Sequence, residues 1–167
     1  LPVSVDSVTV SQGDAAESMQ VYVVPDGLDL LGYVSLTDDA GNTIDLGSVG
    51  TVITKNAEQV LGFSAGQQVH VQDSSLAEAI CQNYLGNSLF VTESAYREAF
   101  GAEPQLNGLL VSLGGTDAQK IALSERLSAD SRTLSVVSTA KLVQDFSSAF
   151  TLINTVVYVV IVLAAAL

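Results

Sequence analysis

Alternating apolar and polar residues dominate the chain from residue 1 to about residue 113. In "VSVDSVTV" the alternation begins at Val3 and Val5 and changes phase at Val8 and Val10, which predicts a bulged or edge strand. "QVYVVPDG" is apolar on both faces and predicts a strand that ends at a Pro-Asp-Gly turn. Short strands are also predicted in "VGTVIT" and "QQVHVQD".

Three segments have helical spacing and helix-terminating residues. "KNAEQVLG" predicts a short helix whose C-terminus is capped by Gly62. "ESAYREAF" predicts a helix of two turns that Thr92 caps and Gly101 ends. Thr116 and Gln119 form a capping-box pattern ahead of "DAQKIALSERLSA", which predicts the third helix.

Further strands are predicted around and after these helices. "AICQNY" and "NSLFVT" predict a strand pair joined at Gly86 and Asn87. "QLNGLLVSL" has few polar positions and predicts a central strand, and "RTLSVVS" predicts the last one. The chain is therefore predicted to be an α+β protein with a mixed or antiparallel sheet and a few short helices.

The C-terminal pattern changes at Thr139, after which there is neither glycine nor proline. A helix can therefore run to Leu167, which is about 29 residues or roughly 43 Å. Its apolar residues recur at helical spacing: Leu142, Phe146, Ala149 and Ile153. We expect Phe146, on the amphipathic first part of this helix, to pack against the folded domain.

The second part of this helix carries no charge between Ala149 and Leu167. A membrane span needs about 20 apolar residues. The alternative, a buried core helix, would have to be enclosed on every side, which a domain of this size can hardly do. We predict an extracellular domain at 1–138, an amphipathic stalk at 139–150 and the start of a truncated transmembrane helix at 151–167.

The charge of the chain restricts its partners and its location. It has 18 acidic and 6 basic residues and a formal net charge of −12, which disfavours binding to nucleic acid. An acidic domain suits the outer side of a bacterial membrane, because Lys-rich and Arg-rich loops tend to stay inside. The chain starts without the pattern of a signal peptide, so we expect it to be a piece of a longer protein.

One short motif has the pattern of a serine hydrolase. "GFSAG", residues 62–66, matches G-x-S-x-G with Ser64 as the nucleophile. That site needs a strand before the serine and a helix after it, whereas a helix precedes and a strand follows here. The only histidine, His70, comes six residues later. The motif is therefore predicted to be a turn.

Candidate metal and nucleotide sites are equally weak. Carboxylates and an amide cluster at Asp38, Asp39, Asn42 and Asp45, but the spacing does not fit an EF-hand, and a hairpin turn is favoured. His70 and a single cysteine, Cys81, cannot build a Cys/His zinc site. "GGTDAQK" lacks the Walker spacing. The sequence therefore predicts no catalytic, cofactor-binding or metal-binding residues, and no enzyme.

An ordered series of segments over about residues 50–167 resembles a known family. "AICQNYLGNSLFVTESAYREAFG", "NGLLVSL" and the long C-terminal helix resemble the extracellular domain and following span of FtsX-like, MacB-class ABC transporter permeases of Gram-positive bacteria. The family's E-N-Y-like triplet and its T-x-x-x-Y-x-x-x-F-G helix have matching positions here: Asn83, Tyr84, Thr92, Tyr96, Phe100 and Gly101. Gln82 replaces the usual glutamate, and Gln67 stands where an aspartate is usual in the turn after "VLG".

The resemblance implies a non-catalytic domain outside the cell membrane and between two spans of a permease. It also implies a separate cytoplasmic ABC ATPase whose cycle moves the spans. The domain would pass that movement to a lipid, lipoprotein, peptide or envelope enzyme, and it would face a sister extracellular domain or a second permease copy.

Two other functions stay open at this point. A membrane-anchored binding or adhesion module would need one span and no ATPase. A membrane-anchored hydrolase would use Ser64. An acidic surface can attract a cationic peptide, but it is also an ordinary solvated surface.

Overall fold

The computed structural model describes residues 1–71, 74–77, 79–81 and 87–165. The chain divides into two compact units, which we call unit 1, Leu1–Ser112, and unit 2, Leu113–Leu167. The division predicted from the sequence, at residues 138 and 150, follows a different criterion and stays a prediction.

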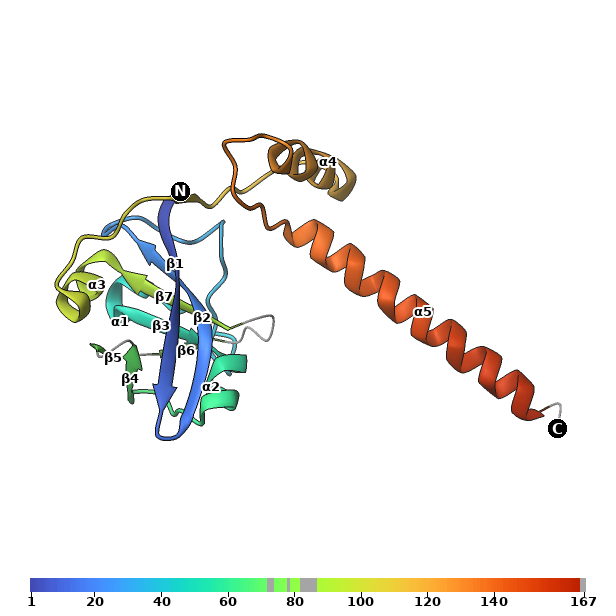
Figure 1. The fold of residues 1–167 in the computed structure, drawn as a ribbon, viewed down its shortest axis with the longest axis horizontal. Helices are drawn as coiled ribbons and strands as arrows, with labels where there is room; N and C mark the ends of the chain where they lie inside the picture. The colour runs from blue at the N-terminus through green and yellow to red at the C-terminus, as the bar shows by residue number, and fades with distance from the viewer. Residues whose placement is uncertain (72–73, 78, 82–86, 166–167) are drawn as a thin grey trace. The chain divides into compact units, whose positions relative to one another are not determined.

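Unit 1 is built on a mixed β-sheet (Figure 1). Its strands are β1 Pro2–Gln12, β2 Ala15–Val24, β3 Thr51–Thr54, β4 Gln68–Val71, β5 Ser74–Ala77, β6 Ala79–Cys81, β7 Ser88–Thr92 and β8 Gly108–Leu109. They are ordered β5-β4-β1-β2-β7-β3-β6, and β8 pairs with the start of β1. Parallel pairs join β2 to β7 and β3 to β6, and the other pairs are antiparallel. The predicted α+β class with a mixed sheet is confirmed.

The prediction that "AICQNY" and "NSLFVT" form a strand pair is wrong. β3 lies between β6 and β7, parallel to the first and antiparallel to the second. β6 and β7 are close in sequence, but β3, from residues 51–54, provides the backbone hydrogen-bond partners for both of them.

The sheet of unit 1 is covered on both faces. Neighbouring residues alternate between the faces, so that Leu89 and Val91 of β7 enter one core and Phe90 enters the other. Helices α2 and α3 pack on the first core through Ala57, Leu61 and partly buried residues of α3. On the second core lie segments of the chain between β2 and β3: Leu30, Leu36 and Leu46.

The phase change in β1 has a cause other than a bulge. The pairing of β1 with β2 is regular from Ser4 to Gln12, and β4 pairs on its other side, so the prediction of a bulged or edge strand is wrong. Val3 belongs to the second core, whereas Val8 and Val10 belong to the first. The strand therefore changes the face that it buries as it runs from one core to the other.

Two of the short helices of unit 1, α2 and α3, end at the glycines that the sequence predicts. α1 Leu46–Val49, which the sequence pattern did not predict, is capped by the side chain of Asp45. α2 Lys55–Leu61 ends at Gly62, and α3 Glu93–Phe100 ends at Gly101, each glycine being left-handed. The Thr92 side chain accepts a hydrogen bond from the backbone N–H of Ala95. The predictions for α2 and α3 are confirmed.

Two predicted strands do not form. "QLNGLLVSL" contributes only the two residues of β8, which lies at the end of β1, so it is not a central strand. "RTLSVVS" contains no strand, and Leu134 and Val137 are fully and 73% exposed. Both segments are short and rich in apolar residues, as strands are, but a strand also needs a partner, and among the described residues they find almost none.

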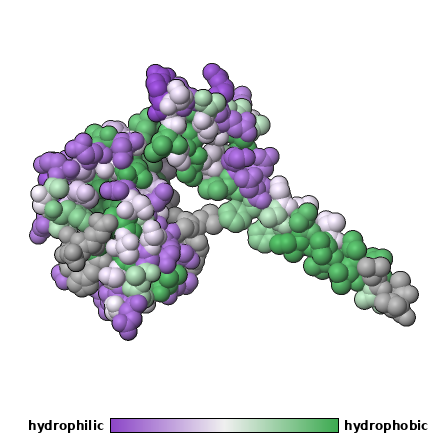
Figure 2. All heavy atoms as spheres, in the orientation of Figure 1, coloured by the Kyte–Doolittle hydropathy of each residue, from purple (hydrophilic) through white to green (hydrophobic). Residues whose placement is uncertain are grey.

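Unit 2 consists of two helices. α4 Asp117–Ser128 begins with the predicted capping box, in which Thr116 and Gln119 bond each other's backbone. α5 Thr139–Ala165 has 27 residues and confirms the predicted long helix, of which residues 166–167 lie outside the described part. Figure 2 shows hydrophobic side chains along most of α5.

α5 is long and apolar enough to span a membrane. Its segment Thr139–Val162 has a mean hydropathy of 1.7 and is not buried. Phe146 is 49% exposed within this helix, and its expected contact with the folded domain stays a prediction.

Candidate functional site

The "GFSAG" motif is a turn, as predicted. Gly62 caps α2, and the backbone N–H of Ser64 donates to the side-chain oxygen of Gln67 at 2.8 Å. The Gln67 N–H donates back to the carbonyl of Ser64 at 3.1 Å. The serine therefore sits in a helix-turn-strand connection, the reverse of a nucleophile elbow.

The acidic segment around Asp38 is a hairpin turn, as predicted. A β-bridge joins Thr37 to Thr43, and the Asp38 carboxylate accepts bonds from the backbone N–H groups of Ala40 and Asn42. The side-chain amide of Asn42 also donates to Asp38 at 3.0 Å, and it is the main cause of a lowered Asp38 pKa. The carboxylate is thus occupied in shaping the turn.

The residues of the family-like helix α3 have packing roles. The rings of Tyr96 and Phe100 stack with centroids 4.6 Å apart, and both contact the first core. The E-N-Y-like positions Gln82, Asn83 and Tyr84 lie outside the described residues.

The single histidine and the single cysteine lie on different strands. His70 is in β4 and Cys81 is in β6, five places apart in the strand order. Within the described residues, no group of three His, Cys, Asp or Glu side chains comes together in a way that could hold a metal ion.

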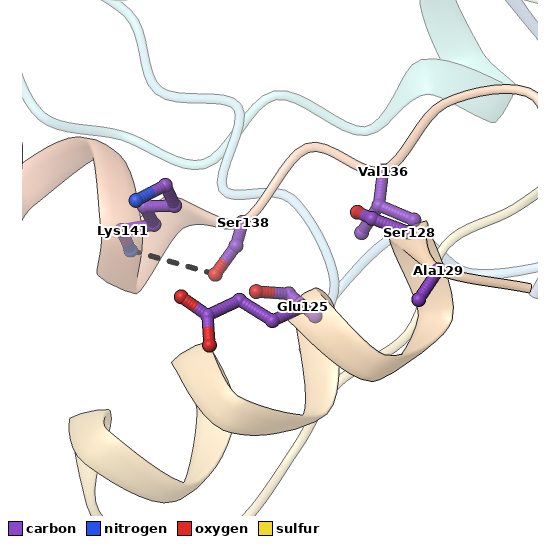
Figure 3. Close-up of a pocket in the computed structure, with 7 residues that line it drawn as sticks. Glu125, Ser128, Ala129, Val136, Ser138 and Lys141 are labelled. Carbon is purple, nitrogen blue, oxygen red and sulfur yellow. Dashed lines mark hydrogen bonds between the residues drawn. The ribbon is translucent and has the colours of Figure 1, made fainter.

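Unit 2 contains a hollow of about 480 Å³ at the connection between α4 and α5, where most of the lining residues are serine or charged. Ser138 and the first turn of α5 form one side, where the backbone N–H of Lys141 donates to the Ser138 hydroxyl (Figure 3). Glu125 of α4 points into the same space. These groups cap and join two helices, which is a structural role.

Unit 1 contains a second pocket, of about 350 Å³, which is lined mainly by apolar residues of two segments, 27–36 and 43–47. Leu30, Leu36 and Leu46 are at most 6% exposed and form its floor as part of the second core. Leu28 and Leu31 also line it, but they are 45% and 59% exposed. The pocket therefore has a buried apolar floor and an accessible apolar rim.

Local hydrogen bonds hold the walls of this pocket in place. The carbonyl of Leu30 accepts from the N–H groups of Tyr33 and Val34, at 2.9 and 3.0 Å. The N–H of Ile44 donates to the carbonyl of Leu36 at 2.8 Å. The pocket is thus formed by the fold of the chain itself, without a ligand.

Two carboxylates stand in the wall of the pocket. Asp29 accepts from the N–H of Leu31 at 2.8 Å, and Asp45 accepts from the N–H of Gly47 at 3.0 Å. Both side chains are exposed, and neither takes part in an ion pair found in the described part of the chain. Two acidic side chains therefore lie beside an apolar surface.

The sequence analysis missed this pocket. "GLDLLGY", residues 27–33, has neither strand nor helix periodicity, so the pattern assigns it no element. Three leucines within a loop bounded by glycines are the observation that could have marked it.

Comparison with known proteins finds solved structures that are similar in fold. No family model and no curated protein matches the chain. The solved extracellular domain of YknZ, an ABC-type transporter of Gram-positive bacteria, is 15% identical with a TM-score of 0.50, and 64% of each chain is covered. The periplasmic region of MacB from Actinobacillus actinomycetemcomitans is 10% identical with a TM-score of 0.48, over 87% of this chain and 74% of that one.

The YknZ domain belongs to an ABC-type transporter, which is the class of protein that the sequence motifs resemble. At 15% identity the likeness to YknZ shows that the fold is shared, and the chain spans about 64% of that domain's length.

Proposed function

We propose that this chain is the extracellular part of an ABC transporter permease, and that it passes movement of the membrane helices to a partner outside the cell. The observation that carries the proposal is α5, a long unburied apolar helix in a chain that shares its fold with the extracellular domain of YknZ.

The distribution of charge along α5 supports a stalk that continues into a span. Its charged side chains, Lys141 and Asp145, lie 3.9 Å apart in the first two turns, and residues 146–165 carry no charge. An uncharged run of this length is close to what a bilayer crossing needs. With the span predicted to begin at residue 151, the stalk residues 139–150 project about 18 Å beyond the membrane, at 1.5 Å per residue.

An unbroken helix suits mechanical coupling. α5 contains neither glycine nor proline, so tilting or sliding the membrane part displaces residue 139 as well. Serine and threonine hydroxyls bond carbonyls one turn back, as Thr151 does to Ser147 and Thr155 does to Thr151, both at 2.9 Å. Those polar groups thereby enter the apolar region without unpaired donors.

The proposed work is non-catalytic. Ser64 lies in a helix-cap turn, and the Asp38 cluster shapes a hairpin, so both hydrolase-like and calcium-like motifs have structural roles in this fold. A separate cytoplasmic ATPase would supply the energy, and a sister extracellular domain or a second permease copy would lie beside this one.

Co-purification of the full-length parent protein from detergent-solubilised membranes tests this proposal. Mass spectrometry is expected to recover an ATP-binding-cassette ATPase in near-stoichiometric amount. The matched control is the parent protein without residues 1–138, which should retain the ATPase, because the proposed contact to it runs through the membrane and cytoplasmic parts.

Recovery of envelope proteins alone, under conditions that preserve other transporter complexes, would overturn the proposal. That result would favour the membrane-anchored binding module, for which the exposed apolar pocket of unit 1 is the specific supporting observation.

A further inference from the structure

We propose that the apolar pocket of unit 1 binds an apolar side chain of a cationic peptide segment. This names the class of outer partner that the proposed function leaves open. It rests on the proposed function only in placing the pocket outside the cell.

The floor and the rim of the pocket differ in how far their leucines are exposed. The floor leucines are already buried, so an entering group would cover mainly Leu28 and Leu31, which are 45% and 59% exposed. Removing such surface from water favours binding of an apolar group. The volume of about 350 Å³ is at the small end for ligand sites and suits one or two side chains.

The negative charge of residues 1–54 indicates which charge the ligand should carry beside its apolar side chain. Residues 1–54 contain no lysine, arginine or histidine. They contain eight acidic residues, which are Asp6, Asp14, Glu17, Asp26, Asp29, Asp38, Asp39 and Asp45. The first basic residue, Lys55, is paired with Asp39 at 3.3 Å and with Glu58 at 2.7 Å. A ligand that places cations beside its apolar side chain would complement Asp29 and Asp45.

The same charges argue against the headgroup of an anionic lipid. A phosphate near the rim would meet two carboxylates that lack ion pairs within the described chain. Like charges in such proximity disfavour binding. The peptide is therefore the occupant that the pocket fits.

Fluorescence anisotropy tests the proposal with the full 167-residue chain in phosphatidylcholine nanodiscs. The probe is a rhodamine-labelled peptide amide of sequence Lys-Leu-Lys-Leu-Lys, compared with Glu-Leu-Glu-Leu-Glu and Lys-Ser-Lys-Ser-Lys. We expect the first to bind, the acidic peptide not to bind, and the serine peptide to bind at least tenfold more weakly. Empty nanodiscs correct for peptide held by the lipid.

Two variants assign the binding to this pocket. Leu31→Ser should weaken binding about tenfold, because it removes most of an apolar rim residue. Its control is Val60→Ser, which makes a similar change at a 52% exposed residue of α2 outside the pocket. Each variant is first checked for an unchanged melting temperature.

The charge is tested by Asp29→Asn combined with Asp45→Asn. Asparagine keeps the acceptor oxygen that each residue offers to the backbone, so the loops should stay folded. We expect binding about tenfold weaker and a flatter dependence on salt. The control, Asp6→Asn with Asp14→Asn, removes the same charge from exposed positions that do not line the pocket.

Equal losses in the test and control variants would overturn the proposal, because binding would then follow net charge alone. Leu31-dependent binding of phosphatidylglycerol vesicles without peptide binding would overturn it in favour of a lipid site. If the co-purification recovers the ATPase but the pocket binds no peptide, this inference is wrong and the proposed function still stands.

Discussion

In unit 1 the buried apolar residues of β1, β2, β3, β4 and β7 are 0–7% exposed, whereas the large apolar residues of α5 in unit 2 are 40–71% exposed. Every buried apolar residue found in the described part of the chain lies in unit 1. The α5 residues are no more polar than those of the sheet. Unit 1 therefore encloses its own apolar residues, and the exposed apolar surface of α5 is what the proposed membrane span would cover.

The largest expected effect comes from placing charge in α5. Val156→Asp combined with Val160→Asp should abolish membrane association, because an aspartate at the centre of a span costs about 2.5–3.5 kcal/mol. The measurement is retention of the chain in membranes after alkaline carbonate extraction.

The control for this pair is Thr139→Asp with Gln144→Asp, which adds the same charge in the stalk and should leave the chain in the membrane. The melting temperature of unit 1 should stay unchanged in both. A lowered melting temperature in the Val156 and Val160 variant alone would contradict the comparison, since α5 would then be part of the core.

A second test deletes apolar volume in each unit. Leu89 is fully buried in the first core, so Leu89→Ala should lower the free energy of unfolding by about 2–5 kcal/mol. Ile153 is 55% exposed, so Ile153→Ala should change that free energy by less than about 0.5 kcal/mol. Urea unfolding in detergent measures both. Similar losses at the two positions would break the comparison.

A third test removes the same helix cap in each unit. Thr92 caps α3, which packs on the first core, so Thr92→Ala should destabilise unit 1 by about 1 kcal/mol. Thr116 caps α4 with the same geometry, but the helix buries only Ser124. Thr116→Ala should therefore reduce helicity by circular dichroism without moving the main unfolding transition. A shift of that transition would show that α4 unfolds together with unit 1.

The smallest expected effect is on how stability depends on pH, which should differ between a variant at Asp38 in unit 1 and a variant at Asp130 in unit 2. The amide of Asn42 is the first cause of a lowered Asp38 pKa, and Arg132 is the first cause of a lowered Asp130 pKa. A lowered pKa stabilises the fold above the ordinary aspartate range and loses that contribution as the pH falls through the folded pKa.

Asp38→Asn should therefore be less stable than the parent chain at pH 7, with the difference shrinking as the pH falls below the ordinary aspartate range. Asp130→Asn should leave the unfolding of unit 1 unchanged at every pH, since Asp130 and Arg132 are in unit 2. Urea midpoints between pH 2.5 and 7 measure both. A constant difference across that range would show that the Asp38 charge contributes nothing.

The sequence predicted well where the determining contacts are local. Gly62, Thr92 and Thr116 mark helix ends through bonds within a few residues, and the long helix from Thr139 is visible because nothing interrupts it. The Asp38 hairpin and the turn at Ser64 follow from the same local chemistry.

The pairing of strands that are far apart in the sequence could not be predicted from local patterns. The pattern of "NGLLVSL" and "RTLSVVS" is that of strands, yet neither finds a full partner in the described chain. The placement of β3 between β6 and β7 depends on residues 51–54 meeting two segments that come more than 20 positions later.

The sequence by itself therefore determined the α+β class, the helix boundaries and the membrane-like character of α5, because periodicity, capping and uninterrupted hydrophobicity act over short distances. Only the tertiary structure decided the order of the strands, the two cores that explain the phase change between Val5 and Val8, and the pocket of unit 1. The strand order and the two cores arise from segments far apart in the chain meeting across a sheet, and the pocket arises from an irregular segment folding onto the second core. No periodic pattern in the sequence encodes either.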